Sequence, residues 1–122
     1  MAAPYLQELE ALLAKTAAAI GGETNIDARH FFSGAAAYAD GRMFISLTPA
    51  GLALKLSEAD RDILSERGGR PLKYFPKAPI KKDYLVLPDA IAEDDAALAG
   101  WIEKSVAHVL TLPQPRPKSG GR

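Results

Sequence analysis

Basic residues and aromatic rings alternate over residues 61–82, the stretch best suited by composition to bind an anion. It holds seven Lys and Arg against two acidic residues. Lys and Arg neutralise phosphates, and Tyr or Phe rings stack on bases. The alternative is a solvated strand edge, where Lys discourages strand pairing between molecules. We favour the strand edge, because residues 83–104 carry six acids against one Lys and would neutralise the patch. The candidate nucleic-acid or anion surface consists of Arg70, Lys73, Tyr74, Lys77, Lys81 and Lys82.

Residues that enzymes use are present, but not in the patterns that catalysis requires. Ser33 lacks the first glycine of the G-x-S-x-G elbow and falls inside a predicted strand. Gly68-Gly69 follows a predicted helix and precedes a strand, which is the reverse of a phosphate-binding loop. The chain has no Cys, which excludes disulfides, thiolate metal sites and thiol catalysis. We therefore expect a protein that is not an enzyme and has no catalytic residues and no cofactor.

Metal ligands are also not arranged as a metal site. His30 and His108 are the two histidines, and neither lies in an H-E-x-x-H pattern. The acids Asp89, Glu93 and Asp94 lack the D-x-D-x-D-G spacing of a calcium loop. Acids at the start of a helix are favourable against its dipole, which explains this cluster better. The sequence predicts no metal site.

Composition predicts one small globular domain. The 122 residues carry 15 basic and 15 acidic side chains, so no large basic excess marks the chain as a nucleic-acid or membrane-surface protein. No apolar run approaches the ~20 residues of a membrane span, and the N-terminus lacks the pattern of a signal peptide. We expect a cytoplasmic protein with one domain over residues 1–112 and a disordered, basic, Pro/Gly-rich tail over 113–122.

Hydrophobic periodicity and turn residues predict an α+β fold with two layers. Helices are expected at both ends, packed on one face of an antiparallel sheet of about five strands, in the order α-β-β-β-α-β-β-α. The expected elements are a helix over 4–20, strands over 30–39, 42–48 and 52–56, a helix over 59–67, strands over 72–75 and 84–87, and a helix from residue 93. Gly21-Gly22 is expected to end the first helix, and Ser57 to cap the second. Alternation over 52–56 places Lys55 on the outer face of its strand. The last helix is expected to bury a stripe made up of Leu98, Trp101, Ile102, Ser105, Val106 and Val109.

The first hairpin suggests an interface. Asp40-Gly41 predicts a two-residue type I′ turn, which places Tyr38 opposite Met43, Ala36 opposite Ile45 and Gly34 opposite Leu47 on the core face. The opposite face is less polar than a solvated face should be. Either another part of the chain covers this face, or a partner does. We take it as a candidate interface with a protein partner or a second copy, as in a homodimer, formed by Ala35, Ala37 and Phe44.

Several short motifs occur in an order and spacing that resemble the N-terminal domain of the TfoX/Sxy family. The similarity extends over about residues 31–110. The motifs are Phe32-Ser33-Gly34, Tyr38, Asp40-Gly41, Met43-Phe44, Leu54-Lys55, Tyr74-Phe75, Tyr84, Pro88, Leu98 and Trp101 through Ser105.

The resemblance implies an α+β fold with an antiparallel sheet, similar to secretion-chaperone-like domains, and no catalytic residues. Longer family members regulate natural competence and carry a second, C-terminal domain, so we expect a stand-alone version of the N-terminal domain here. The predicted function is a non-enzymatic interaction or regulatory module that acts through a protein partner or self-association. The alternative is a nucleic-acid-binding regulatory protein that uses residues 61–82.

Overall fold

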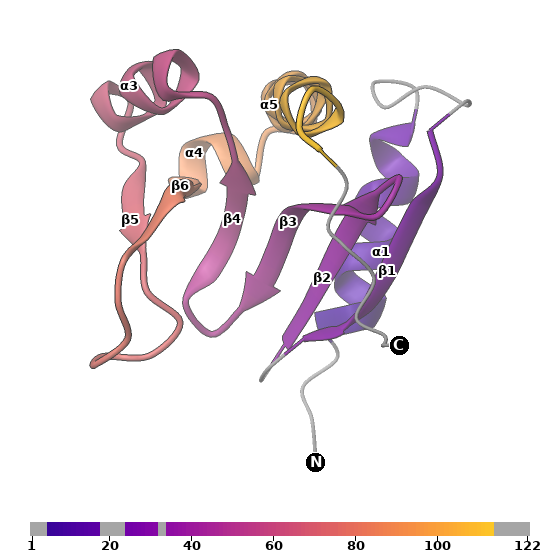
Figure 1. Ribbon diagram of the computed structural model, residues 1–122, viewed down its shortest axis with the longest axis horizontal. Helices are drawn as coiled ribbons and strands as arrows, with labels where there is room; N and C mark the ends of the chain where they lie inside the picture. The colour runs from indigo at the N-terminus through magenta and orange to yellow at the C-terminus, as the bar shows by residue number, and fades with distance from the viewer. Residues whose placement is uncertain (1–4, 18–23, 32–33, 114–122) are drawn as a thin grey trace.

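The computed structural model describes residues 5–17, 24–31 and 34–113, which form one antiparallel sheet and four helices (Figure 1). The strands lie in the order β1-β2-β3-β4-β6-β5. The α+β class is confirmed, and the sheet has six strands rather than about five. The elements are α1 (Tyr5–Lys15), β1 (Ile26–Phe31), β2 (Gly34–Ala39), β3 (Arg42–Thr48), β4 (Gly51–Lys55), α3 (Glu58–Glu66), β5 (Arg70–Leu72), β6 (Lys81–Val86), α4 (Asp89–Ala92) and α5 (Asp95–Leu110).

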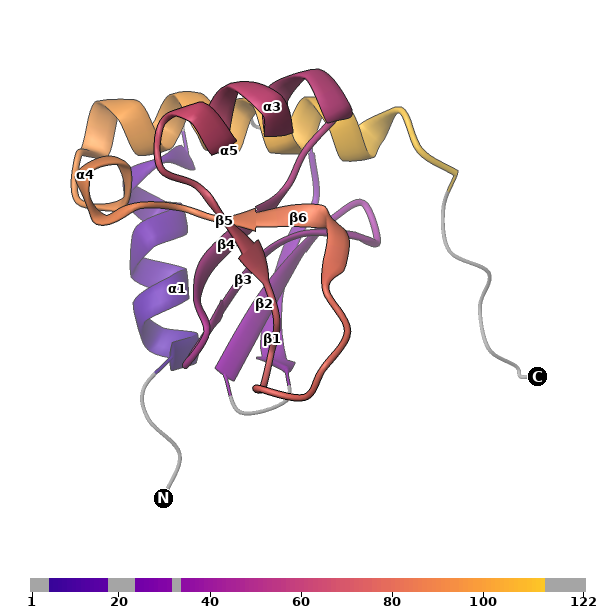
Figure 2. The same cartoon turned by 90° about the vertical axis from the view of Figure 1, so that its left-hand side faces the viewer.

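The four helices pack on one face of the sheet, which we call the helix-covered face. Figure 2 shows α1 and α5 on one side of the strands and the loop between β5 and β6 on the other. The buried apolar residues of all four helices join a single cluster with the strands, and a second, smaller cluster contains strand and loop residues alone. The second cluster lies on the opposite side, which we call the helix-free face.

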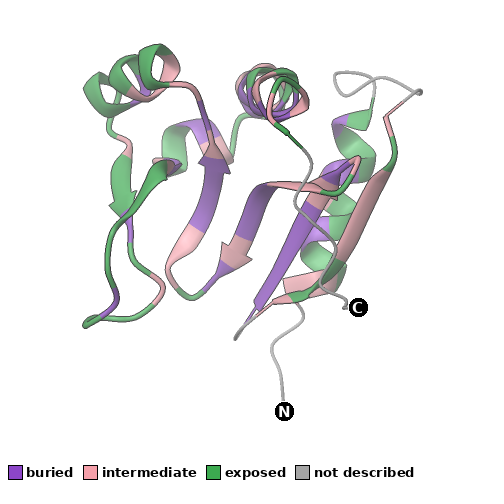
Figure 3. Ribbon diagram, in the orientation of Figure 1, coloured by how far each residue is buried: buried purple, intermediate pink, exposed green. Residues whose placement is uncertain are grey.

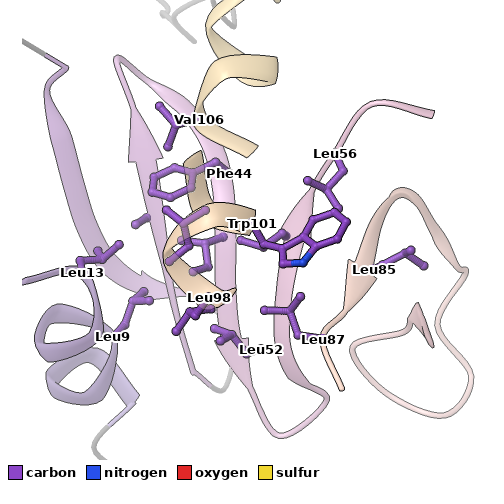
Figure 4. Packing of buried hydrophobic residues seen from close by; sticks show 14 of the residues in the cluster. Leu9, Leu13, Phe44, Leu52, Leu56, Leu85, Leu87, Leu98, Trp101 and Val106 are labelled. Carbon is purple, nitrogen blue, oxygen red and sulfur yellow. The ribbon is translucent and has the colours of Figure 1, made fainter. Parts of the chain in front are cut away.

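The main core lies between the helices and the sheet. Leu9 and Leu13 of α1 and Leu98 and Trp101 of α5 lie in one cluster with Phe44 and the leucines of β4 (Figure 4). Figure 3 shows that β2 and β4 are buried along most of their length. Alternate β2 positions are alanines, which let α1 lie close to the strand. The apolar stripe of α5 is confirmed in full, because each of its members is buried: Leu98, Trp101, Ile102, Ser105, Val106 and Val109.

The Asp40-Gly41 turn is confirmed, but the register beyond it is shifted. Asp40 has φ of 49° and Gly41 has φ of 85°, as a type I′ turn requires. Tyr38 pairs with Met43 as predicted. A bulge then inserts Phe44 as an extra residue. The predicted pairs of Ala36 with Ile45 and Gly34 with Leu47 are therefore wrong, and the pairs that form are Ala37–Ile45, Ala36–Ser46 and Ala35–Leu47.

The bulge is held by a buried serine of the last helix. Pairing of β3 with β4 ends at Ile45–Leu54. Beyond that pair, the Phe44 carbonyl oxygen lies 2.9 Å from the Ser105 hydroxyl, and the Lys55 carbonyl oxygen lies 2.7 Å from it. Because Ser105 is fully buried, its hydroxyl supplies the donor that water cannot. This contact fixes α5 over the place where the two strands separate.

The predicted strand over 30–39 is in fact two strands. Strand β1 pairs antiparallel with β2, from Ile26–Ala39 to Phe31–Gly34. A Cβ on Gly34 would lie 2.2 Å from the Leu47 carbonyl oxygen, so only glycine fits there. The strand prediction was wrong because it interpreted this glycine as part of a continuous strand.

The second half of the chain follows the predicted order, with changed boundaries. The Ser57 hydroxyl accepts a hydrogen bond from the Asp60 backbone N–H and caps α3, as predicted. Asp94 caps α5 in the same way through the Ala97 N–H. The short helix α4 was not predicted. Strand β6 begins at Lys81 rather than at Tyr84. The expected helix stop at residues 21–22 and the expected tail beyond residue 113 lie outside the described residues.

Candidate functional site on the helix-free face

The predicted protein interface is wrong, because its residues lie inside the protein. Ala35, Ala37 and Phe44 have no exposed surface. They belong to the core cluster beneath the helices. Next to the turn, the helices cover the face that was not assigned to the core, so Tyr38 lies on the other side of the sheet. Beyond the bulge, Ile45 and Leu47 lie in the core, as predicted. The other side of the sheet, the helix-free face, has partly exposed side chains at its surface.

The five cations of the predicted anion surface are all exposed. Arg70 lies in β5, Lys73 and Lys77 lie in the loop that follows, and β6 begins with Lys81 and Lys82. Lys81 is the pairing partner of Leu72 at the end of β5. We call these five residues, which follow one edge of the sheet and its loop, the cationic segment.

The acidic residues of the stretch 83–104 do not pair with this cationic segment. Among the described residues, Asp83 pairs with Arg61 at 3.6 Å and Asp95 pairs with Lys15 at 3.2 Å. The remaining ion pair of the described chain joins Arg29 to Asp27. The cationic segment therefore keeps its charge available for an anion.

Tyr74, the sixth member of the predicted surface, turns inward across the sheet. Its ring meets the Phe31 ring edge-on, with centroids 5.4 Å apart and planes at 69°. Its hydroxyl donates to the Ser46 hydroxyl at 3.4 Å. Phe31 lies in the edge strand β1, and Tyr74 follows the other edge strand, β5. The two edges of the sheet therefore approach each other across the helix-free face.

Two further tyrosines lie on this face, and each has a cation over its ring. The Arg29 guanidinium carbon lies 5.9 Å from the Tyr38 ring centroid, and the Lys55 Nζ lies 5.9 Å from the Tyr84 ring centroid. These distances are within the range of cation–π attraction. We call Phe31, Tyr38, Tyr74 and Tyr84, all partly exposed, the ring cluster.

Small residues under the ring cluster form its floor. Ala36, Ser46 and Ala53 are fully buried although no helix packs on them. Tyr74 and Tyr84 pack against Ala53 together with Leu72 and Val86. Because the floor residues are small, large rings can lie over the strands.

Two of these tyrosines have hydroxyls whose pKa is raised, so they stay protonated further into alkaline solution than a free tyrosine does. Burial raises the pKa of Tyr84, and the neighbouring Tyr74, Tyr38 and Asp83 raise it further. Burial also raises the pKa of Tyr74, although its hydrogen bond with Ser46 acts in the opposite direction. Both side chains therefore present neutral hydroxyls.

Sequence reasoning identified part of this site. It placed Lys55 on the outer face of β4, which the structure confirms. It missed Phe31 and Arg29, because β1 was not predicted as a separate strand. It assigned Tyr38 to the core face, whereas the helices cover the other one. Ser33 lies outside the described residues.

The described residues hold no group of three or more His, Asp or Glu side chains that could bind a metal ion. Likewise, none of the described helices combines the length and apolar character needed to span a membrane.

Comparison with protein families agrees with this fold. A family model for the TfoX N-terminal domain matches residues 18–109. The chain belongs to the TfoX N-terminal domain family. A search of curated proteins finds no matching relative. The family match covers all six strands, so the ring cluster and the cationic segment both lie within the TfoX N-terminal domain.

Proposed function

We propose that this TfoX N-terminal domain is a non-enzymatic binding module that holds single-stranded nucleic acid on its helix-free face. One observation carries the proposal: partly exposed rings, Tyr74 among them, lie on the helix-free face, and the cations of the cationic segment around Tyr74 pair with none of the described acids. Rings and cations are the two components that single-strand binding surfaces combine.

The two parts of the face have separate roles. Lys73, Lys77, Lys81 and Lys82 attract the phosphates. Between Lys73 and Lys77 lie the partly exposed ring of Tyr74 and the exposed ring of Phe75, on which unstacked bases stack. Because the chain has no net charge, attraction comes from this local segment rather than from the whole molecule.

A single strand fits this face better than a duplex does. The bases of a duplex are stacked inside it and cannot reach the rings. Reading a duplex by its bases needs an element that enters a groove, usually a helix or a two-stranded ribbon. All four helices of the described chain have their apolar sides packed against the sheet.

Fluorescence anisotropy with labelled oligonucleotides tests the proposal. The probes are a dT strand, a U-rich RNA strand and a DNA duplex of the same length, each titrated at several salt concentrations. We expect the strands to bind, the duplex to bind at least about tenfold more weakly, and log K to fall with log salt with a slope of about −2 to −3, as expected for about three or four neutralised phosphates.

Two charge reversals of equal size separate this face from the rest of the surface. Lys81→Glu with Lys82→Glu should weaken binding at least about tenfold. Arg67→Glu with Lys104→Glu changes the net charge by the same amount on the side of the helices and should have a much smaller effect. Equal loss from both pairs, duplex binding as strong as single-strand binding, or no retention at low salt would each overturn the proposal.

Tyr74 distinguishes stacking from simple charge attraction. Tyr74→Phe keeps the ring and should bind like the wild type, whereas Tyr74→Ser removes the ring and should lose the ~1–3 kcal/mol of one stacked base. If the two variants bind equally, the ring cluster takes no part in binding.

A further inference from the structure

A second binding feature lies on the helix-covered side, between α3 and α5. A groove of 240 Å³ separates the two helices there. Its walls and floor are mainly apolar, and Ile63 of α3 is 43% exposed at its edge. Isolated exposed apolar residues are common on proteins, so exposure by itself does not indicate a site. The shape and the charge of this groove provide the further evidence.

The groove is hollow because α5 carries a glycine inside it. A Cβ built on Gly100 meets no atom within 4 Å, so nothing nearby requires glycine for close packing. Glycine is a poor residue for a helix interior. Beside it lie Ala97 and Trp101, and the Trp101 ring forms part of the groove lining. The missing side chain leaves space for an apolar group from outside.

Each side of the groove has a cation. Arg67 follows the end of α3, and Lys104 belongs to α5 with its Nζ 5.8 Å from the Trp101 ring centroid. Neither takes part in an ion pair of the described chain. Their acidic sequence neighbours, Glu66 and Glu103, do not line the groove. The groove therefore offers positive charge on both sides of an apolar floor.

We infer that this groove docks an acidic, apolar peptide segment of a partner protein. An apolar side chain of the segment fills the space above Gly100, and flanking carboxylates pair with Arg67 and Lys104. This matches the helix-in-groove mode of peptide recognition, in which apolar anchors enter the groove and charge sets the orientation. The groove and the helix-free face lie on different sides of the sheet, so a peptide and a nucleic-acid strand can be bound together.

The single tryptophan of the chain reports binding directly. The probe is a synthetic peptide of about twelve residues, built from Glu and Leu with the Leu side chains along one helical face. Titration should change the Trp101 fluorescence in a saturable way. Two control peptides should each bind at least about tenfold more weakly. The one with Lys in place of Glu lacks the carboxylates, and the one with Ser in place of Leu lacks the apolar side chains.

Filling the groove is the decisive variant. Gly100→Leu places a side chain in the open space and favours the helix, so the protein should remain folded with an equal or higher melting temperature. Peptide affinity should fall at least about tenfold. Ala90→Leu makes a similar small-to-large change at an exposed position of α4, which does not line the groove, and should bind like the wild type.

The charge variants complete the test and separate it from the nucleic-acid proposal. Arg67→Glu with Lys104→Glu should lose the peptide and keep the oligonucleotide, whereas Lys81→Glu with Lys82→Glu should do the reverse. No saturable fluorescence change, or normal peptide binding by Gly100→Leu, overturns the inference. Light scattering that shows a dimer which Gly100→Leu dissociates also overturns it, because the occupant is then a second copy.

Discussion

The two faces of the sheet are built from different residues and are closed in different ways. The helix-covered face is closed by apolar side chains of α1, α3, α4 and α5, which pack on alanines, leucines and Phe44 of the strands. The helix-free face is closed only in part, by tyrosine rings from β2, β6 and the loop after β5, over a floor of small residues. The first arrangement excludes water, and the second leaves polar groups and rings at the surface.

This difference separates stability from binding. Apolar burial under the helices contributes most of the folding free energy, because that contribution grows with the area removed from water. The helix-free face buries fewer large apolar side chains, Leu72 and Val86 beside its small floor residues, and its partly exposed rings and exposed lysines lie at the surface. Substitutions on the two faces should therefore have unequal effects, and the following predictions measure the inequality.

The largest effect is expected at Phe44. Phe44→Ala leaves a cavity in the centre of the helix-covered core and should lower the free energy of unfolding by about 3–5 kcal/mol. Denaturant unfolding measures this loss. Phe75→Ala is the matched control, because Phe75 is 59% exposed and its removal should cost about 0.5 kcal/mol or less. Similar losses from both variants would contradict the assignment of the core.

A smaller effect is expected at Ser105. Ser105→Ala removes the donor that serves the Phe44 and Lys55 carbonyls and should cost about 1–3 kcal/mol. The same denaturant experiment applies, with Ser65→Ala on the exposed side of α3 as the control. If Ser105→Ala unfolds at the same denaturant concentration as the wild type, the serine does not hold the bulge.

The smallest effect on stability at neutral pH is expected from removing the Tyr84 hydroxyl. This effect grows as the solution becomes alkaline. Its pKa is raised in the folded protein, so below about pH 10 the hydroxyl is protonated in both states and contributes no pH dependence. As the pH rises above 10, the unfolded chain loses the proton first, and stability falls until the pH passes the folded-state pKa. The slope from one such group is at most about 1.4 kcal/mol per pH unit.

Thermal unfolding from pH 7 to pH 11 measures this slope. Tyr84→Phe has no hydroxyl to titrate and should lose stability less steeply above pH 10 than the wild type. Parallel curves for the two proteins would show that Tyr84 is not buried on the helix-free face as described.

Local signals predicted local structure well. The type I′ turn at Asp40-Gly41, the Ser57 cap and the apolar stripe of α5 depend on residues near one another in the chain, and each is confirmed. The same is true of Lys55 on the outer face of β4. Turns, caps and helix stripes depend on residue types at short, fixed spacings, which can be read from the sequence.

Features that depend on distant contacts were not predictable in the same way. The bulge at Phe44 is stabilised by Ser105, which lies far along the chain, and it moves the register by one residue. The face that the helices cover depends on how they pack, which periodicity does not reveal. For this reason Ala35 and Ala37 were assigned to an interface although they lie in the core.

Only part of the candidate site could be predicted from the sequence, because only part of it comes from neighbouring residues. Its lysines form a run in the sequence, whereas its rings come from four separate segments. Gly34 was the one local signal that could have revealed β1 and with it Phe31, because a glycine inside a predicted strand often marks a close approach of two backbones.

The contact between Phe31 and Tyr74 has a consequence for the order of folding. It joins the two edge strands of the sheet, and its partners are far apart in the chain, so closing it requires that every strand between them is already in place. We therefore expect the ring cluster to assemble last and to open first. Amide hydrogen exchange should be faster in β5 and in its loop than in β3, which lies at the centre of the sheet.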